Sequence, residues 1–478
     1  MRIFRRLDLD RFFQQKTKGP EAFRGFSTDS RKLEPDSLFF ALRGETHDAH
    51  NFLQQAFDAG ARAFVVEKWD PKVPSEGCVV YRVPDTLKAL QNLANFERNK
   101  FQGPEVGITG SNGKTTTKEF LAAILEPFRR LHYSRESFNN HFGVPFTLLS
   151  QPEEAQVVIC EMGMNHRHEI EKLCAINRPT HVVCTMVGTA HIESLGSPEG
   201  IAQAKEEIYS AAPDESVRVY NLDNPWTAQM VHRAHPRSAR VIRFSGQDSG
   251  AEVFLRVREM DFDQIWIEGS ILGVEGSQKI PVFGTQNLTN IQAAVSLALG
   301  IGLSPFEIWS SLSRCRSLWG RNQRIQTEAG FEILFDGYNS NPESMKALLD
   351  NFSKLRGVRR GAAVFAEMLE MGSWADTFHE QVGRWVGESD LKAVYFFGPH
   401  ADSFAKGYVA SGRGLENRNS LVVSQSYEES LARSVFAVLE AKDLLLVKGS
   451  RGMKLEKVVQ AAGAKNFSLD KSTPVRAS

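Results

Sequence analysis

A glycine-rich loop at residues 107–117 constrains the fold of this chain more than any other segment. It reads G-I-T-G-S-N-G-K-T-T-T and stands between a predicted strand at 105–109 and a predicted helix at 118–125. A strand, a glycine turn and a helix N-terminus form an anion site, because free backbone N–H groups and the positive end of the helix dipole face the phosphates. The loop therefore predicts an α/β domain that binds ATP.

The spacing of this loop departs from the strict pattern G-x-x-x-x-G-K-[ST], since Ile108 stands five residues before Gly113. A turn that is rich in glycine by chance is the alternative, and the strand–loop–helix context argues against it. Lys114 is expected to reach the β- and γ-phosphate oxygens, and the Thr115 hydroxyl to bind Mg²⁺. We expect ATP to contact Gly110, Ser111, Asn112, Gly113, Lys114, Thr115 and Thr116.

Strand-like and helix-like patterns alternate along the chain, which predicts α/β layers with mostly parallel sheets. At 478 residues the chain is too long for one core, so we expect three blocks, at 1–99, 100–317 and 318–478. The first has expected strands at 37–42 and 63–67, a helix at 51–59 and a proline-rich stretch at 71–84. The later strands are expected at 105–109, 157–160, 181–187, 333–335, 362–365, 393–397, 421–423 and 444–447.

The charges of the chain balance, with 57 Lys plus Arg and 57 Asp plus Glu. This gives no support to a nucleic-acid or membrane-surface partner recognised by bulk charge. No window approaches the roughly 20 apolar residues of a membrane span, and the N-terminus lacks the apolar stretch of a signal peptide. Five scattered cysteines without C-x-x-C spacing predict buried thiols in a reducing compartment. We expect a cytoplasmic enzyme; protein partners and oligomeric state are not predicted.

Three residues far from the loop form a second group of candidates. Glu161 ends an apolar run, a position typical of a carboxylate that binds Mg²⁺. The alternative is a solvated glutamate at a strand end. Ser197 and Pro198 predict the start of a helix on which residues 201, 205, 208 and 212 share one face. Lys205 in that apolar face either snorkels, pairs or is chemically altered. His191 is either a hydrogen-bonded structural residue or a ligand near the phosphates.

Taken together, these segments resemble the Mur ligase family, the ATP-dependent amide-forming ligases of peptidoglycan synthesis. The matching pieces follow the family order: residues 28–52, TGSNGKTTTKE (109–119), SFNNHFGVP (137–145), EMGMNH (161–166), AHIESLGSPEGIAQAKEEI (190–208), GRNQR (320–324), DGYNSNPESM (336–345), EMLEMG (367–372) and VKGSRGMKLEKVV (447–459). The Y-N-x-N-P-x-S-M and E-M-x-E-x-G segments resemble the branch that joins D-alanyl-D-alanine to UDP-N-acetylmuramoyl-tripeptide. The D-Y-A-H-x-P and D-N-P-R segments, usual in the type that adds the third residue, do not occur.

The resemblance implies a three-domain architecture with an N-terminal UDP-substrate domain, a central P-loop domain and a C-terminal Rossmann-like domain for the incoming dipeptide. It implies that Thr115 and Glu161 hold one Mg²⁺, and that His191 and a carbamylated Lys205 hold or border a second. The implied nucleotide contacts beyond the loop are Asn287, Arg321 and Asp336, and the implied substrate contacts are Ser30, Arg31, Asn140, Asn339, Asn341 and Lys448.

A two-step ligation follows from this assignment, with Lys114, His191 and Lys205 as its catalytic groups. The tripeptide carboxylate attacks the γ-phosphorus and displaces ADP, giving an acyl phosphate; this step needs positioning and charge neutralisation but no base. The amine of D-alanyl-D-alanine then attacks the acyl carbon, expels phosphate and loses a proton, for which His191 is a candidate acceptor. Whether the third tripeptide residue is lysine or diaminopimelate stays open. The linker near 316–320 is the expected hinge.

Some positions depart from the usual family pattern. Gln286, Phe335, Ala366 and Glu367 stand where the family usually has His, Asp, Gly and Asp, and Met371 replaces a Leu. These positions bear on the adenine and ribose contacts.

Two alternative functions remain open. One alternative is another ligase of the superfamily, such as a folate polyglutamate or cyanophycin-type ligase. The other is a P-loop ATPase that binds a partner and ligates nothing.

Overall fold

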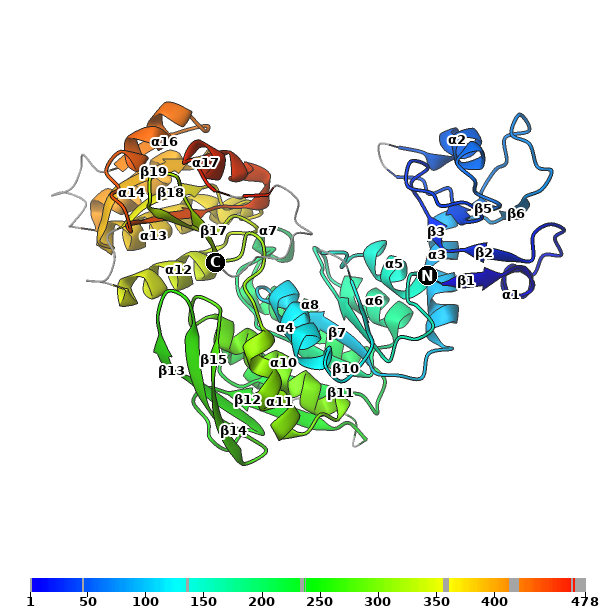
Figure 1. The fold of residues 1–478 in the computed structure, drawn as a ribbon, viewed down its shortest axis with the longest axis horizontal. Helices are drawn as coiled ribbons and strands as arrows, with labels where there is room; N and C mark the ends of the chain where they lie inside the picture. The colour runs from blue at the N-terminus through cyan, green and yellow to red at the C-terminus, as the bar shows by residue number, and fades with distance from the viewer. Residues whose placement is uncertain are drawn as a thin grey trace.

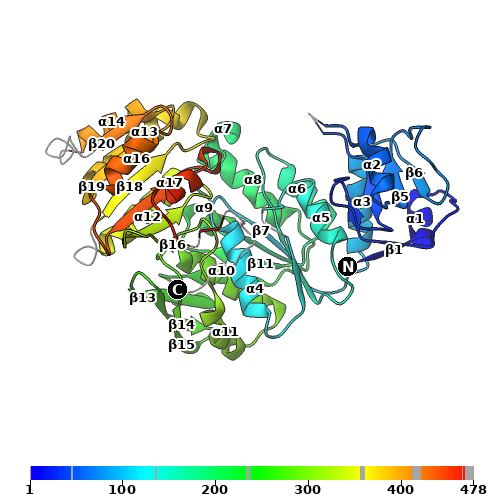
Figure 2. The same cartoon turned by 45° about the horizontal axis from the view of Figure 1, so that its top comes forward.

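A computed structural model describes residues 2–44, 47–134, 137–232, 236, 238–355, 361–411, 421–465 and 467–468. Three sheet-centred units follow one another along the molecule, with the N-terminal and C-terminal units at opposite ends and the middle unit between them (Figures 1 and 2). The sheets of the three units differ in size: four strands, nine strands and six strands, with a further two-stranded sheet at the N-terminus. The predicted α/β class is confirmed.

The N-terminal unit is built on the parallel sheet β3-β4-β5-β6. Its elements are β1 (Ile3–Arg5), α1 (Arg6–Phe13), β2 (Ala22–Arg24), β3 (Phe26–Ser27), β4 (Leu38–Phe40), η1 (Ala49–Phe52), α2 (Leu53–Asp58), β5 (Ala63–Val66), β6 (Val79–Arg82) and α3 (Thr86–Arg98). The strand β6 lies within the proline-rich stretch at 71–84, which we predicted without a strand. It forms because Val79 and Tyr81 bury their side chains against the core.

The middle unit carries the sheet β15-β14-β13-β12-β11-β10-β7-β9-β8, parallel from β8 to β13 and antiparallel at β14 and β15. Its elements are β7 (Glu105–Thr109), α4 (Lys114–Leu125), β8 (Leu131–Tyr133), α5 (Gly143–Leu149), β9 (Val157–Glu161), α6 (Glu169–Asn177), β10 (His181–Cys184), α7 (Ile192–Leu195), α8 (Pro198–Ser210), β11 (Val217–Asn221), α9 (Pro225–Val231), β12 (Val241–Ser245), β13 (Val253–Met260), β14 (Ile265–Ile271), β15 (Val274–Ile280), α10 (Asn287–Ile301), α11 (Pro305–Ser311) and η2 (Leu312–Arg314). Helices α4 and α10 cover one face of the sheet, and α5, α6 and α8 cover the other.

The C-terminal unit is built on the sheet β16-β17-β21-β18-β19-β20, in which only β16 runs antiparallel to its neighbour. Its elements are β16 (Gln323–Gln326), β17 (Glu332–Asp336), α12 (Pro342–Lys354), β18 (Gly361–Ala366), η3 (Gly372–Trp374), α13 (Ala375–Glu388), β19 (Leu391–Phe397), α14 (Ala401–Ala410), β20 (Leu421–Ser424), α16 (Glu429–Phe436), β21 (Leu444–Lys448), η5 (Arg451–Met453) and α17 (Glu456–Ala461). Each expected strand of this block is present, within two residues of its predicted ends.

Two boundaries in the middle unit differ from the prediction, and both concern the glycine loop. Helix α4 begins at Lys114, four residues before the expected start, because the left-handed Gly113 (φ 84°) ends the loop directly before it. Strand β10 ends at Cys184 rather than at residue 187. The chain leaves the sheet there because Met186 turns to the loop, where its carbonyl accepts from the Ser111 backbone N–H at 2.8 Å.

Candidate active site

The phosphate loop lies at the carboxyl edge of the middle sheet, where β7 runs between β9 and β10. Ligands of parallel α/β sheets bind at this edge. Two of its glycines are required by close packing as well as by backbone angle. A Cβ on Gly110 (φ 147°) would lie 1.9 Å from Thr185 Oγ1, and one on Gly113 would lie 2.0 Å from Asn290 Oδ1. The loop conformation therefore leaves no room for side chains at these two positions.

The Lys114 side chain folds back over this loop, and its Nζ donates to the Gly110 carbonyl at 2.8 Å. Withdrawal from solvent lowers the pKa of Lys114, and the neighbouring Arg321 lowers it further, while Glu161 raises it. A lysine held in this way presents one positive charge at the mouth of the loop, where the phosphates of a nucleotide bring the opposite charge.

A carboxylate and a hydroxyl meet beside the loop. The Thr115 hydroxyl donates to Glu161 Oε2 at 2.8 Å, and the Asn139 amide donates to Glu161 Oε1 at 2.8 Å. Glu161 is 1% exposed, which rules out the alternative of a solvated strand end. Among the described residues no ion pair compensates its charge. A buried carboxylate next to a threonine hydroxyl is the hard-oxygen donor set that suits Mg²⁺.

Lys205 lies in the buried face of α8, as the stripe of residues 201, 205, 208 and 212 predicted. Helix α8 begins as expected, with the Ser197 side chain accepting from the Gly200 N–H and Pro198 in the first turn. The Lys205 side chain does not snorkel, because it is 1% exposed. Burial, with a smaller contribution from Lys114, lowers the pKa of Lys205 to about 7. In the described part of the chain it forms no hydrogen bond and no ion pair.

His191 stands at the start of α7 with a left-handed backbone (φ 67°). Its Nδ1 lies 3.0 Å from Glu370 Oε2 in the C-terminal unit. Burial lowers the pKa of His191, and Glu370 opposes this effect. Glu370 belongs to the quoted segment 367–372, but nothing in its spacing indicated that it faces His191.

A cavity of about 190 Å³ lies between the middle and C-terminal units, next to the loop. Its lining includes most of the residues expected at the nucleotide, and also two that we expected at the substrate. These predicted residues are Asn112, Gly113, Thr116, Asn287, Arg321, Asp336, Asn339 and Lys448. Thr289 and Asn290 also line it and were missed.

The side chains of this cavity hold one another in place. Arg321 lies over the Tyr338 ring, 4.3 Å from its centroid, and its Nη2 donates to Thr115 Oγ1 at 3.1 Å. Lys448 Nζ lies 2.5 Å from Asp336 Oδ2 and donates to the Asn339 carbonyl at 3.0 Å. Lys448 and Asn339 therefore lie with the residues expected at the nucleotide.

The positions that depart from the usual family pattern divide into two groups. Gln286 lines the nucleotide cavity and accepts from the Asn351 amide at 2.5 Å. Phe335 and Ala366 are buried in the core of the C-terminal unit instead. Glu367 is buried, and its Oε1 accepts from His400 Nδ1 at 2.6 Å. Only the first of these exchanges bears directly on the nucleotide cavity.

A larger cavity, of about 1030 Å³, lies between the N-terminal and middle units. Of the residues expected to bind the UDP-substrate, Asn140 lines it. Ser30 and Arg31 are not among its lining residues: Ser30 donates to Gln55 at 3.0 Å, and the exposed Arg31 pairs with Asp29. Their neighbours line the cavity instead, namely Ser27, Thr28, Asp29 and Lys32.

Two further predictions concern the cysteines and the membrane. All five cysteines are buried and free of disulfide bonds, as predicted. Among the described residues, no helix combines the length and the apolar character that crossing a membrane requires.

Comparison with known proteins places these features in one family. Residues 22–98 match the Mur ligase family catalytic domain, residues 108–298 the Mur ligase middle domain, and residues 320–451 the Mur ligase glutamate ligase domain. The UDP-N-acetylmuramoyl-tripeptide–D-alanyl-D-alanine ligase of Bacillus subtilis is 34% identical, over 91% of this chain and 92% of that protein.

Solved structures agree with this result. MurF from Acinetobacter baumannii superposes with a TM-score of 0.85 at 27% identity, covering 96% of this chain and 98% of that chain. The MurF ligase of Thermotoga maritima in complex with ADP has a TM-score of 0.77 at 25% identity, covering 92% of this chain and 97% of that chain. The chain belongs to the Mur ligase family.

Proposed function

We propose that this chain is an ATP-dependent ligase that joins D-alanyl-D-alanine to UDP-N-acetylmuramoyl-tripeptide. One observation carries the proposal: the phosphate loop, Glu161, His191 and Lys205 meet at one sheet edge, between a large cavity on the N-terminal side and a smaller cavity on the C-terminal side. The relatives named for this reaction match the chain over nearly its whole length. The same arrangement supports domain boundaries near residues 99 and 317 and a cytoplasmic location, where ATP is available.

The first step calls for two anions to be brought together, the tripeptide carboxylate and the γ-phosphate. Lys114 holds a positive charge over the loop, and the loop N–H groups bind phosphate oxygens, so the barrier falls by positioning and charge neutralisation. Thr115 and Glu161 would hold Mg²⁺, and a carbamylated Lys205 would hold a second ion that His191 borders; Mg²⁺ neutralises phosphate charge when bound. The cavity lined by Asn140 would hold the UDP end of the substrate.

The second step requires the dipeptide amine to lose a proton as it attacks the acyl carbon. His191 has a depressed pKa and is therefore neutral near pH 7, which is the form that accepts a proton. Its Nδ1 faces Glu370, so Nε2 is the nitrogen that remains available. Arg321, Asp336 and Asn287 would hold the nucleotide in the smaller cavity, together with Lys448 and Asn339.

The environment of Lys205 suits carbamylation. Carbon dioxide reacts with a neutral amine, and a pKa of about 7 leaves a large neutral fraction at physiological pH. The product is an anion, so a buried cation without a partner becomes an oxygen ligand for Mg²⁺. A lysine used only for packing gains nothing from this position, because burial of its charge costs free energy.

The decisive assay measures ADP formation with UDP-N-acetylmuramoyl-tripeptide in the presence and absence of D-alanyl-D-alanine. We expect both substrates together to raise the rate well above either alone, and peptide-bond formation to match ADP one to one. A rate that is indifferent to the dipeptide would support a P-loop ATPase that ligates nothing. Parallel assays with lysine and diaminopimelate tripeptides decide the third residue.

The role of Lys205 is tested separately. Lys205→Ala should lose ligation by about 10²–10³-fold, the effect of removing one electrostatic catalytic group, and should regain part of it with added short carboxylates. Full activity of Lys205→Ala would exclude the carbamate. Glu199→Ala, in the exposed first turn of the same helix, is the matched control and should retain activity.

A further inference from the structure

The segment 185–191, which links β10 to α7, is tied to the phosphate loop along its length. The Thr185 hydroxyl donates to the Asn112 carbonyl at 2.6 Å. The Gly188 N–H donates to Ser111 Oγ at 2.9 Å, in addition to the Ser111–Met186 backbone bond. The position of this segment is therefore set on one side by the loop that binds ATP.

The other side of the same segment is held by a carboxylate of the C-terminal unit. Glu343 lies in the first turn of α12, which the Asn341 side chain caps. Glu343 Oε1 accepts from the Thr189 backbone N–H at 2.9 Å, and Oε2 accepts from the Thr189 hydroxyl at 3.0 Å. Two bonds from one carboxylate to one residue fix both its backbone and its side chain. Glu343 occupies a variable position of the segment Y-N-x-N-P-x-S-M.

A second carboxylate of the C-terminal unit reaches His191, two residues further on. Because Glu370 lies 3.0 Å from Nδ1, it holds the proton of a neutral imidazole on that nitrogen and leaves the lone pair on Nε2. Carboxylates orient metal-binding histidines in this manner. His191 and Glu370 both have positive φ, 67° and 63°. Non-glycine residues keep such angles only where their surroundings enforce them.

We propose that Glu343 and Glu370 are positioning residues that set the segment 189–191 and the Nδ1–H form of His191 only when the C-terminal unit is seated against the middle unit. The role in ligation rests on the function proposed above. Both carboxylates belong to the unit expected to bind the dipeptide. Seating that unit against the middle unit would therefore fix the Nδ1–H form of His191 when the dipeptide amine is bound nearby. An open molecule would leave His191 free to change tautomer, which suppresses reaction before the second substrate is bound.

The first experiment reads the tautomer directly and needs no turnover. In protein labelled with ¹⁵N-histidine at about pH 8, the His191 resonances are assigned with His191→Gln and recorded without nucleotide or metal. We expect the Nδ1–H pattern in the wild type and a shift towards Nε2–H, the form that free imidazole prefers, in Glu370→Ala. Glu370→Gln, whose amide oxygen still accepts, should keep the wild-type pattern. An unchanged pattern in Glu370→Ala would overturn the proposal, whether or not the chain is a ligase.

The second experiment separates positioning from binding. Glu343→Ala and Glu370→Ala should each lower kcat by about 10- to 100-fold, while the KM for the UDP-substrate stays within about twofold because its cavity is elsewhere. Thr189→Val should add little on top of Glu343→Ala, since Glu343→Ala already removes the bond of the Thr189 hydroxyl. Asp350→Ala, on α12 and paired with Lys346, is the control and should retain activity. Equal losses in the control, or a changed KM for the UDP-substrate with unchanged kcat, would contradict positioning.

Discussion

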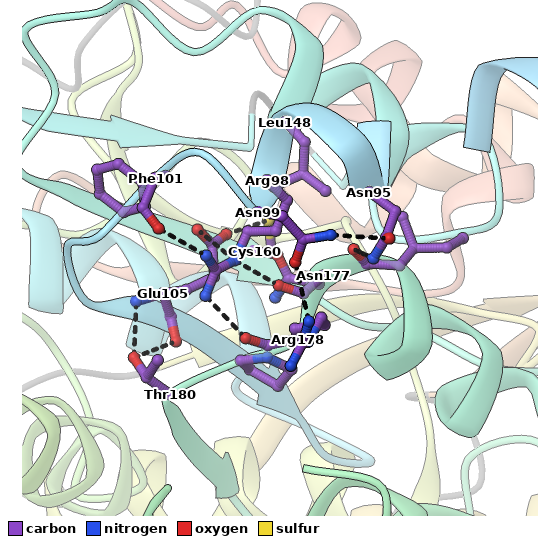
Figure 3. A network of polar contacts seen from close by, with 12 residues as sticks. Asn95, Arg98, Asn99, Phe101, Glu105, Leu148, Cys160, Asn177, Arg178 and Thr180 are labelled. Atoms are coloured by element: carbon purple, nitrogen blue, oxygen red, sulfur yellow. Dashed lines mark hydrogen bonds and ion pairs between the residues drawn. The ribbon is translucent and has the colours of Figure 1, made fainter. Parts of the chain in front are cut away.

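The middle unit meets its two neighbours in different ways. Towards the N-terminal unit, the Arg98 guanidinium of α3 donates to the backbone carbonyls of Asn177, Arg178 and Phe101 at 2.7, 2.9 and 3.0 Å (Figure 3). Beneath it, fully buried Glu105 lies 3.4 Å from Arg98 Nε. A single apolar cluster continues from Leu90 and Leu93 of α3 to Leu148 and Leu173 of the middle unit.

Towards the C-terminal unit, polar side chains pair across the boundary, and of the middle unit's apolar side chains Phe262 and Phe283 join the apolar cluster of the C-terminal unit. Asn341 donates to Asn112 Oδ1 at 2.9 Å, and Asn351 accepts from the Thr285 backbone and hydroxyl at 3.0 and 2.9 Å. Asn341 and Asn351 are both buried, but neutral bonds between side chains contribute less than the bonds of a guanidinium to backbone carbonyls. We expect the N-terminal and middle units to move as one body. The C-terminal unit is then the part expected to open, with the hinge near 316–320.

The largest effect should come from breaking the first interface at Arg98. Arg98→Ala removes three bonds to backbone carbonyls and takes the cation away from the buried Glu105 carboxyl group. We expect a loss of about 3–5 kcal/mol in the free energy of unfolding, measured by urea denaturation, because each buried acceptor left unpaired costs about 1–3 kcal/mol. Arg43→Ala, at a half-exposed surface pair, should cost less than about 1 kcal/mol. A similar cost in both variants would show that the first interface is no stronger than a surface contact.

The same interface should make stability depend on pH through Glu105. Burial raises the pKa of Glu105 from 4.5 to about 8, although Arg98 opposes the shift. Between these values the unfolded state releases a proton that the folded state keeps, so stability falls as pH rises. The Glu105→Gln variant cannot ionise, and its stability relative to wild type should rise by about 4 kcal/mol from pH 4.5 to pH 8. A constant difference across that range would contradict a raised pKa.

Mutations at the second interface, between the middle and C-terminal units, should lower the stability less than Arg98→Ala does. They should instead change how the two units are placed against each other. Asn341→Ala removes both the cap of α12 and the contact with Asn112, while Asn112→Ala removes the contact alone. We expect the first to lower stability by about 1–2 kcal/mol and the second by less. Both variants should show a larger radius of gyration by small-angle scattering. An unchanged radius in both would remove Asn112–Asn341 from the contacts that hold the C-terminal unit.

The sequence predicted the site correctly where its residues are neighbours along the chain. The strand β7, the glycine loop and α4 are consecutive, and so are Ser197, Pro198 and the buried face that carries Lys205. Each pattern needs only backbone geometry and helical spacing to be recognised. The strand ends also place Glu161 beside the loop, because β9 and β7 are neighbours in a parallel sheet.

Contacts between units could not be predicted in this way. Glu343 and Thr189 are 154 residues apart and meet only because two separate sheets are placed against each other. Neither residue lies in a pattern that distinguishes it from a solvated glutamate or a loop threonine. Ser30 and Arg31 show the same limit at short range: the quoted segment borders the large cavity, but the turn at Asp29 points their side chains to Gln55 and to solvent.

The smallest effect is expected at a pair that spans the second interface on its outer side. Arg324 of β16 pairs with Asp263, whose side chain is 66% exposed, and also with buried Glu332 of its own unit. Asp263→Asn should change the free energy of unfolding by less than about 0.5 kcal/mol, since Arg324 keeps its buried partner and the lost pair is screened by water. It should also leave the radius of gyration at the wild-type value, unlike Asn341→Ala. A larger radius of gyration in Asp263→Asn at low salt, unchanged by added salt or nucleotide, would contradict this expectation. It would show that the outer charges, rather than the contacts at the phosphate loop, hold the C-terminal unit in place.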